Sequence, residues 1–276
     1  MMDKQKTQIL NFVAEVTDKS HPKFVPIPDR IAAFDNDGTL WTERPLPPQI
    51  YFILENAKTK NLTVDYKHLS KKKIVELAIK TQTGMDENSY RSSVLKWYNT
   101  AKHPQKNKLF KDLKFKPMTE LIQFLKDNNF TVFIVSGGSR DFMRTFVVEQ
   151  YGIPEYRTVG SSFDITWNDS LNVIERNPKI ELINDHIGKP VGIYNYIGKK
   201  PIFIAGNSDG DYYMMKYAAT SSNPFLNILI THTDSIREYE YNNKIGIDKE
   251  TLALERCQKD KNWLEVSMKK DWNRIY

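Results

Sequence analysis

The chain has 276 residues, of which 40% are hydrophobic and 12% aromatic. This is enough for a sizeable core and excludes a wholly disordered protein. The mean hydropathy is −0.55, and no apolar run approaches the ~20 residues that a membrane helix needs. Since the first twenty residues also lack a secretory leader pattern, we expect a cytoplasmic protein with no membrane partner. A single cysteine, Cys257, excludes an internal disulfide and a cysteine-rich zinc site.

The formal net charge is +6, and it is unevenly distributed. Residues 45–116 carry 15 lysine and arginine residues against six acidic residues, so this segment is +9 and the rest of the chain is −3. The charge is spread without an arginine-rich run or repeated aromatic–basic pairs. This charge distribution therefore indicates a solvated helical surface. The alternative is that the segment attracts an anionic substrate. The distribution does not favour a nucleic-acid partner.

In chain order, residues 6–16 have the pattern of a short helix, and a proline-rich connector follows. Residues 30–35 form an apolar run too short for a helix, which predicts a buried strand. From 45 to 116, apolar residues three and four apart predict amphipathic helices joined by polar loops.

The remainder alternates between strand and helix patterns. The expected elements are a helix over 117–128, a strand over 131–135, a helix from Ser139 to Gly152, strand-like pieces within 157–167, a helix from Pro190 to Ile197, a strand over 201–205, a helix over 212–219 and a strand over 225–230. This alternation predicts an α/β fold, a parallel sheet with helices on both faces, and the segment 45–116 as an insertion after the first strand. Residues 259–276 are expected to pack on the sheet domain.

Ligands of open α/β sheets gather at the carboxyl ends of the strands, so the turns after the strands carry the candidate chemistry. The first strand ends in Asp35-Asn-Asp37-Gly-Thr39. Asp35 could attack a phosphorus atom, while Asp37 protonates the leaving oxygen and later deprotonates water. An Asx-turn is the structural alternative. A calcium loop is not, because no matching run of acidic ligands follows.

The next strand is followed by Ser136-Gly137-Gly-Ser139 before a helix. A hydroxyl and backbone N–H groups at that position can hold a phosphate, although ordinary helix capping uses the same residues.

The strand ending at Ala205 is followed by Gly206-Asn207-Ser-Asp209-Gly-Asp211, whose oxygen-rich side chains suit a hard cation such as Mg²⁺. A lysine before the preceding helix could neutralise a phosphoryl group. Its position favours Lys189 over Lys179 and Lys199.

Taken together, FDNDGTLW, VSGG, the GKP that contains Lys189, and GNSDGD resemble, in this order, the haloacid dehalogenase-like (HAD) hydrolase superfamily. The helical insertion is similar to the C1 cap of the phosphoserine-phosphatase-like branch. The resemblance implies a Rossmann-like parallel sheet flanked by helices, formed by 1–44 and 117–276, with a helical cap formed by 45–116. Members of this superfamily are mostly Mg²⁺-dependent phosphatases.

The resemblance also implies roles for individual residues. Asp35 would be the nucleophile, Asp37 the acid–base residue, and Lys189 both catalytic and phosphate-binding together with Ser136 and Gly137. The metal ligands would be Asp35, the Asp37 backbone carbonyl, Asn207 and Asp211. Asn207 departs from the common pattern, which has an acidic residue there, so Asp209 is an alternative ligand.

In that branch a glutamate shortly after the nucleophile contacts the substrate, and Glu43 is the nearest match, with Trp41 and Arg91 as further candidates. The structural alternatives are a packing role for Trp41 and surface charges for Glu43 and Arg91.

The sequence thus predicts a Mg²⁺-dependent phosphomonoester hydrolase that acts on a small phosphorylated substrate of unknown identity through an aspartyl-phosphate on Asp35. The main alternative is a catalytically weak HAD-fold protein that binds a phosphorylated ligand or a protein partner, motivated by Asn207. A nucleic-acid-binding protein is motivated only by the sequence pI of 9.1. A receiver-type signalling domain is disfavoured by the length and by Asp37. Nothing in the sequence indicates an oligomeric state.

Overall fold

The computed structural model describes residues 3–64, 69–241 and 251–276. Within these ranges, seven strands form one sheet in the order β4-β3-β2-β1-β5-β6-β7. The strands are β1 (Ile31–Phe34), β2 (Thr131–Ser139), β3 (Thr158–Asn168), β4 (Val173–Leu182), β5 (Phe203–Gly206), β6 (Leu226–Thr231) and β7 (Trp263–Ser267). All neighbouring strands are parallel except β3 and β4, which form an antiparallel hairpin. The predicted fold class, an α/β fold with a Rossmann-like parallel sheet flanked by helices, is confirmed, and the antiparallel strand β4 is an addition to it.

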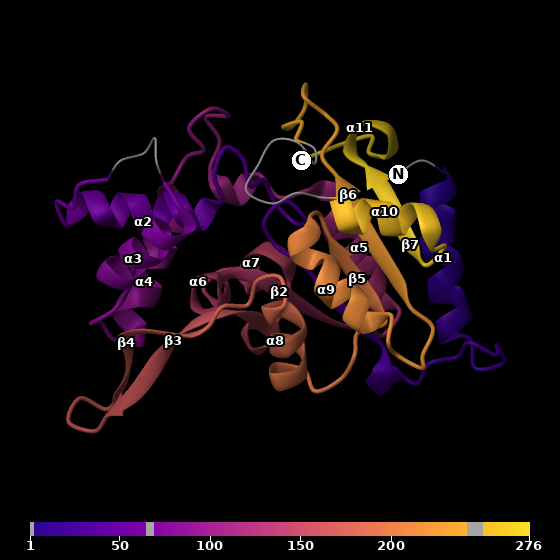
Figure 1. The fold of residues 1–276 in the computed structure, drawn as a ribbon, viewed down its shortest axis with the longest axis horizontal. Coiled ribbons are helices and arrows are strands. Elements are labelled where there is room, and N and C mark those ends of the chain that lie inside the picture. Colours follow the sequence, from indigo (N-terminus) through magenta and orange to yellow (C-terminus); the bar gives the residue numbers. More distant parts are fainter. Residues whose placement is uncertain (1–2, 65–68, 242–250) are drawn as a thin grey trace.

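Helices lie on both faces of the sheet (Figure 1). They are α1 (Asp3–Thr17), α2 (Pro48–Thr59), α3 (Lys71–Gln82), α4 (Glu87–Thr100), α5 (Lys116–Asp127), α6 (Arg140–Arg144), α7 (Val147–Tyr151), α8 (Gly188–Tyr196), α9 (Asp209–Ala218), α10 (Thr251–Lys259) and α11 (Met268–Asp271), with short 3-10 turns at Ile27–Asp29, Phe110–Asp112 and Glu155–Arg157. None of the helices in the described ranges is long and apolar enough to cross a membrane.

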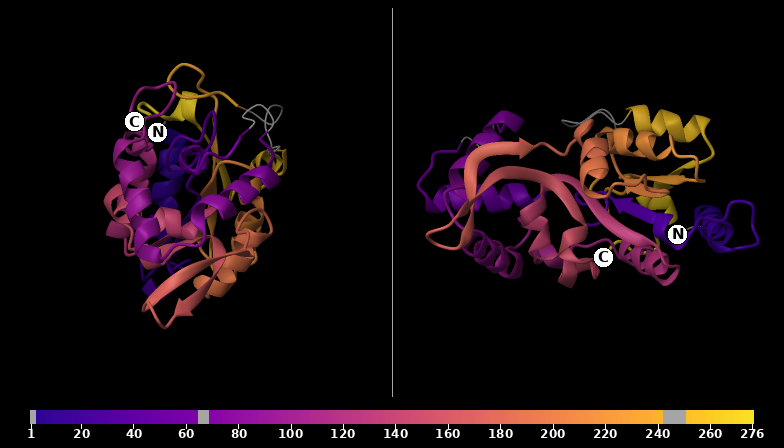
Figure 2. Two further views of the ribbon diagram at one scale, coloured as in Figure 1. Left: turned by 90° about the vertical axis from the view of Figure 1, so that its left-hand side faces the viewer. Right: turned by 90° about the horizontal axis from the view of Figure 1, so that it is seen from below.

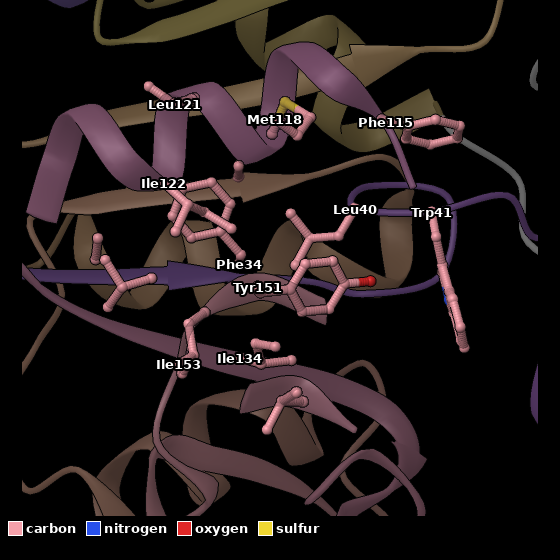
Figure 3. Packing of buried hydrophobic residues seen from close by; sticks show 14 of the residues in the cluster. Phe34, Leu40, Trp41, Phe115, Met118, Leu121, Ile122, Ile134, Tyr151 and Ile153 are labelled. Atoms are coloured by element: carbon pink, nitrogen blue, oxygen red, sulfur yellow. The ribbon is translucent and has the colours of Figure 1, made fainter. Parts of the chain in front are cut away.

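The central strand β1 is buried on both faces, which explains its uninterrupted apolar sequence. Ala32 and Phe34 face the core that includes α1 and α5, whereas Ala33 faces the core that includes α8 and α9. Figure 3 shows Met118 and Ile122 of α5 packed over Phe34. This packing fixes the direction of β1 and therefore the position of the turn that follows it.

Strand β7 forms the edge of the sheet beside β6. Residues 259–276 therefore pack on the sheet domain, as predicted. β7 pairs in parallel with β6, from Trp263 opposite Asn227 to Ser267 opposite Thr231. Near the end of the chain, the carbonyl of Ile275 accepts a hydrogen bond of 2.7 Å from the N–H of Lys116. Cys257 lies on α10 and is half-buried, and burial raises the pKa of its thiol to about 12, so it is not a reactive thiolate.

The prediction of one continuous helix from Ser139 to Gly152 is wrong. β2 runs through Ser139 with a bulge after Val135, and the helical region is divided into α6 and α7 at Thr145 and Phe146. The Ser139 hydroxyl makes no capping bond and is buried without a partner. The Ser139 N–H donates to Gln49 Oε1 at 2.7 Å, which joins this segment to α2.

β4 was not predicted from the sequence. It is an edge strand with Pro178 and alternating charged residues, a pattern that resembles a loop. The β3–β4 hairpin extends beyond the ends of the other strands and reaches α3 and α4 (Figures 1 and 2). The carbonyl of Arg176 accepts a bond of 3.1 Å from the N–H of Gly84, and its buried guanidinium lies 3.8 Å from the ring centre of Tyr90. The hairpin therefore joins the helical insertion in space, although it belongs to the segment 117–276 in sequence.

Candidate active site

The strands that carry the sequence motifs, β1, β2 and β5, are adjacent in the sheet, so their carboxyl ends meet at one edge. A cavity of about 330 Å³ opens there. The predicted site residues that line it are Asp35, Asp37, Glu43, Ser136, Gly137, Lys189, Asn207 and Asp211. The structure therefore brings together residues that lie up to 176 positions apart in the sequence.

Lys189 is the buried cation of this site. Its Nζ lies 2.6 Å from Asp35 Oδ1 and 2.5 Å from Asp211 Oδ1. Burial by itself would lower the pKa of Lys189, but the two carboxylates together raise it, so the lysine stays charged. Burial also raises the pKa of Asp35 well above its usual range, with Lys189 opposing this effect. The alternative lysine Lys199 instead pairs with the exposed Asp29, at 2.6 Å.

Asp37 is held by the indole of Trp41, whose Nε1 donates to Asp37 Oδ1 at 2.6 Å. Burial raises the pKa of Asp37 to about 6, while the Trp41 bond and the charge of Lys189 act in the opposite direction. Trp41 is fully buried against Phe146 and does not line the cavity. Its position is that of a residue that orients Asp37, not of the substrate contact that the sequence suggested.

Glu43 and Asn207 form one buried network. Asn207 Nδ2 donates to Glu43 Oε1 at 3.0 Å, and the Tyr241 hydroxyl donates to the same oxygen. Thr39 Oγ1 donates to Asn207 Oδ1 at 3.1 Å. Burial raises the pKa of Glu43 to about 7, although the Tyr241 bond favours its charged form. Thr39 belongs to the DGT motif, whereas no sequence signal pointed to Tyr241.

The turn after Asp37 requires glycine. Gly38 has φ +78°, and a Cβ there would lie 2.3 Å from Asn207 Nδ2. The carbonyl of Gly38 lies 2.6 Å from His232 Nε2. Burial lowers the pKa of His232 to about 3, so its ring is neutral and Nε2 is the donor. His232 therefore fixes the turn without adding charge.

The two aspartates of the motif after β5, Asp209 and Asp211, make different contacts. Asp209 accepts the N–H groups of Leu252 and Ala253, at 3.2 and 2.9 Å, and so caps α10 outside the cavity. Asp211 binds Lys189 with Oδ1 and accepts the N–H groups of Asn207 and Ser208 with Oδ2. Asp209 therefore does not fit the role of an alternative metal ligand, whereas Asp211 lines the cavity and holds both Lys189 and the turn after β5.

At the end of β2, Ser136 and Gly137 face the cavity. The Ser136 hydroxyl accepts a bond of 3.0 Å from the N–H of Gly138. These groups belong to the bulged part of β2. The expected phosphate site at a helix N-terminus is therefore a site on a strand. Gln49, which sequence reasoning missed, joins α2 to this loop through the Ser139 N–H.

Arg91 lies away from the cavity. Its guanidinium binds both carboxylate oxygens of Glu155, at 2.6 and 3.0 Å, and both side chains are partly exposed. The structure therefore gives Arg91 an ion pair between α4 and the turn before β3, and not the predicted substrate contact.

No protein-family model matches the chain, and no curated protein matches its sequence. Among solved structures, a conserved protein of unknown function from Anaerococcus prevotii DSM 20548 has a TM-score of 0.61 at 13% identity, over 95% of this chain and 91% of that one. A protein of unknown function from Bordetella pertussis Tohama I has a TM-score of 0.55 at 11% identity, over 86% and 97%. These two share the fold.

A phosphoserine phosphohydrolase-like protein from Francisella tularensis subsp. tularensis SCHU S4 has a TM-score of 0.42 at 16% identity, over 73% of this chain and 87% of that one. In the present chain, the adjacent parallel strands β1, β2 and β5 carry the sequence motifs at one edge of the sheet.

Proposed function

We propose that this chain is a HAD-type phosphatase, a Mg²⁺-dependent phosphomonoester hydrolase. The observation that carries the proposal is the buried Lys189 held between Asp35 and Asp211 at the carboxyl ends of the motif-bearing strands, with Asp37 beside them. Buried charges are costly to maintain, and such clusters in a cavity favour a catalytic site.

The mechanism uses the two aspartates in turn. An Asp35 carboxylate oxygen attacks phosphorus, and the P–O bond to the leaving group breaks as Asp37 gives its proton to that oxygen. Asp37, now a carboxylate, takes a proton from water, and the resulting hydroxide attacks the aspartyl-phosphate. Inorganic phosphate leaves, and the Asp35 carboxylate is restored. A pKa of about 6 lets Asp37 serve in both protonation states near neutral pH.

The remaining polar groups position and neutralise the phosphoryl group. Lys189 supplies a fixed positive charge beside the nucleophile, and Ser136 and the Gly137 N–H are placed to bind phosphoryl oxygens. The helices of residues 45–116 and the β3–β4 hairpin act as a cap over this end of the sheet.

The donor set at the site fits Mg²⁺ in kind. Among the described residues, no group of three or more His, Cys, Asp and Glu side chains is arranged as a metal site. Mg²⁺, however, is bound through one or two carboxylates with waters and phosphate oxygens. The Asp35 carboxylate, the Asp37 backbone carbonyl and the Asn207 amide oxygen would hold it. When bound, the ion neutralises the repulsion between the phosphoryl dianion and Asp35.

Removal of the metal tests this assignment. We expect hydrolysis of a generic aryl phosphate in Mg²⁺, loss of activity in excess chelator, and recovery when Mg²⁺ is restored, because Lys189 is already paired with Asp35 and Asp211 and cannot by itself offset the charge of the dianion. Phosphate release measured across a panel of phosphomonoesters, with and without Mg²⁺, provides the readout. Full activity in chelator would argue for a different hydrolase chemistry. Binding of the esters without turnover would favour the alternative of a phosphate-ester-binding protein, which Asn207 motivates.

The contact between Asn207 and Glu43 gives a second prediction. In Asn207→Asp, a carboxylate replaces the amide that donates to Glu43, so two buried carboxylates meet at about 3 Å. The pKa of Glu43 should rise above its present value of about 7, and the variant should lose about 2 kcal/mol of stability at pH 8 and less at pH 6.

The double variant with Glu43→Gln should recover the melting temperature, since the Gln amide can donate to the new carboxylate. If Asn207 ligates the metal, the same double variant should bind Mg²⁺ more tightly in calorimetry than the wild type does. An unchanged melting temperature in Asn207→Asp would contradict the contact.

The indole of Trp41 gives a third prediction, about pH. Its hydrogen bond favours the charged form of Asp37, so Trp41→Phe should raise the pKa of Asp37. The first step needs protonated Asp37, so the descending limb of the pH profile of kcat/KM should move to higher pH by about one unit. Trp272→Phe is the control, because this buried indole has no partner for its N–H. If the pH profiles of kcat/KM were the same in both variants, the orienting role of Trp41 would be contradicted.

A further inference from the structure

The cavity has two chemically different ends. The polar end holds Asp35, Ser136 and Lys189 at the strand ends. The opposite wall is built by α2, α3 and the β3–β4 hairpin, and most of its side chains are apolar. They include Ile50, Ile53, Ile74, Val75, Phe163 and Ile180.

The hairpin makes this wall possible. Phe163 and Ile180 are partners in the β3–β4 register and contribute from the sheet side. Ile53 and Phe163 are almost fully buried, while Ile74 and Val75 of α3 are half-buried, so the apolar wall is partly open. The hairpin contacts α3 and α4. The helical side and the hairpin side of the wall are therefore held together.

Charged groups are scarce at the apolar end. Away from the strand ends, the charged residues of the described lining are Lys71 and Asp185, which pair with each other. Lys71 Nζ lies 3.5 Å from Asp185 Oδ2, where both side chains are partly exposed. The hydroxyls of Ser161 and Ser162 also line the cavity and donate to the Gly137 carbonyl and to Glu181. Gln49 is engaged with the Ser139 N–H. An amino-acid or sugar leaving group would therefore leave its polar atoms against hydrocarbon, which is unfavourable.

We propose that the substrate is the phosphomonoester of an apolar alcohol, with the phosphoryl group at Asp35 and a hydrocarbon chain or ring between α2, α3 and the hairpin. This inference rests on the proposed function, which places the phosphoryl group at the polar end. A volume of about 330 Å³ is sufficient for one small hydrocarbon group, because ligand cavities begin at about this size.

Binding of phosphonates, whose C–P bond is not hydrolysed, tests the proposal separately from catalysis. Calorimetry in Mg²⁺ would compare methyl-, butyl-, hexyl- and phenylphosphonate with 2-amino-4-phosphonobutanoic acid, an amino-acid analogue close in length to the butyl compound. We expect affinity to rise about fourfold per methylene up to hexyl. The amino-acid analogue should bind more weakly than butylphosphonate. The hexyl and phenyl arms distinguish a chain-shaped from a ring-shaped pocket.

The corresponding phosphate esters, assayed for hydrolysis in the same buffer, test the proposed function itself. Affinity that rises with chain length, but without hydrolysis of any ester, supports the apolar pocket and overturns the phosphatase. Equal affinity along the series, or preference for the amino-acid analogue, overturns the apolar substrate even if every ester is hydrolysed.

A matched pair of variants locates the effect. Val75→Asn should weaken hexylphosphonate about tenfold and leave methylphosphonate unchanged, because only the longer ligand reaches α3. Val191→Asn makes the same change on α8, outside the cavity and 49% exposed, and should change neither. Ile74→Asn offers a second position on the wall if Val75→Asn does not fold. Unchanged hexylphosphonate affinity in a folded wall variant would overturn the proposal.

Discussion

Replacement of Asp35 by asparagine is expected to lower kcat for any phosphomonoester substrate by at least about a thousandfold. The amide has the same shape as the carboxylate but is a poor nucleophile, and it cannot form the aspartyl-phosphate. Lys189 retains its bond to Asp211, at 2.5 Å, so the cation stays paired and the fold should be kept. The measurement is phosphate release under single-turnover and steady-state conditions, with circular dichroism and thermal unfolding to confirm the fold.

The matched control is Asp209→Asn, since Asp209 belongs to the same motif region but caps α10 outside the cavity. It should reduce stability and leave the chemical step near its wild-type rate. Turnover by Asp35→Asn close to that of the wild type would exclude Asp35 as the nucleophile.

The sequence predicted best what depends on buried strands and short motifs. Strands such as residues 31–34 are buried on both faces, so their composition is apolar throughout and their ends are marked by polar turns. The positions of Asp35, Ser136 and Asn207 around one cavity follow from this, because parallel strands place their carboxyl ends together.

Contacts between distant segments could not be predicted in this way. The local sequence of Asp209 suits a metal ligand, and only the placement of α10 shows that its carboxylate caps another helix. Tyr241 reaches Glu43 from 198 residues away, and most residues of β4 are only partly buried, so neither has a local signature. The sequence therefore predicted strand-like pieces in β3 but not their pairing with β4 in the hairpin that builds one wall of the cavity.

Replacement of Lys189 by methionine is expected to abolish activity and to destabilise the fold by about 3 kcal/mol or more, because it leaves Asp35 and Asp211 buried without their cation. The pKa of Asp35 in the folded protein, already raised by burial, should rise further once Lys189 no longer opposes this effect.

A carboxyl group whose pKa is higher in the folded than in the unfolded state costs stability as the pH rises above its unfolded value near 4. The deficit of Lys189→Met relative to the wild type should therefore be small at about pH 4 and should grow towards pH 8. Thermal unfolding across this range measures it. Lys199→Met is the matched control, since it removes an exposed pair with Asp29 at 2.6 Å and should cost less than about 1 kcal/mol. Equal, pH-independent losses in the two variants would contradict a buried ion triad at the centre of the site.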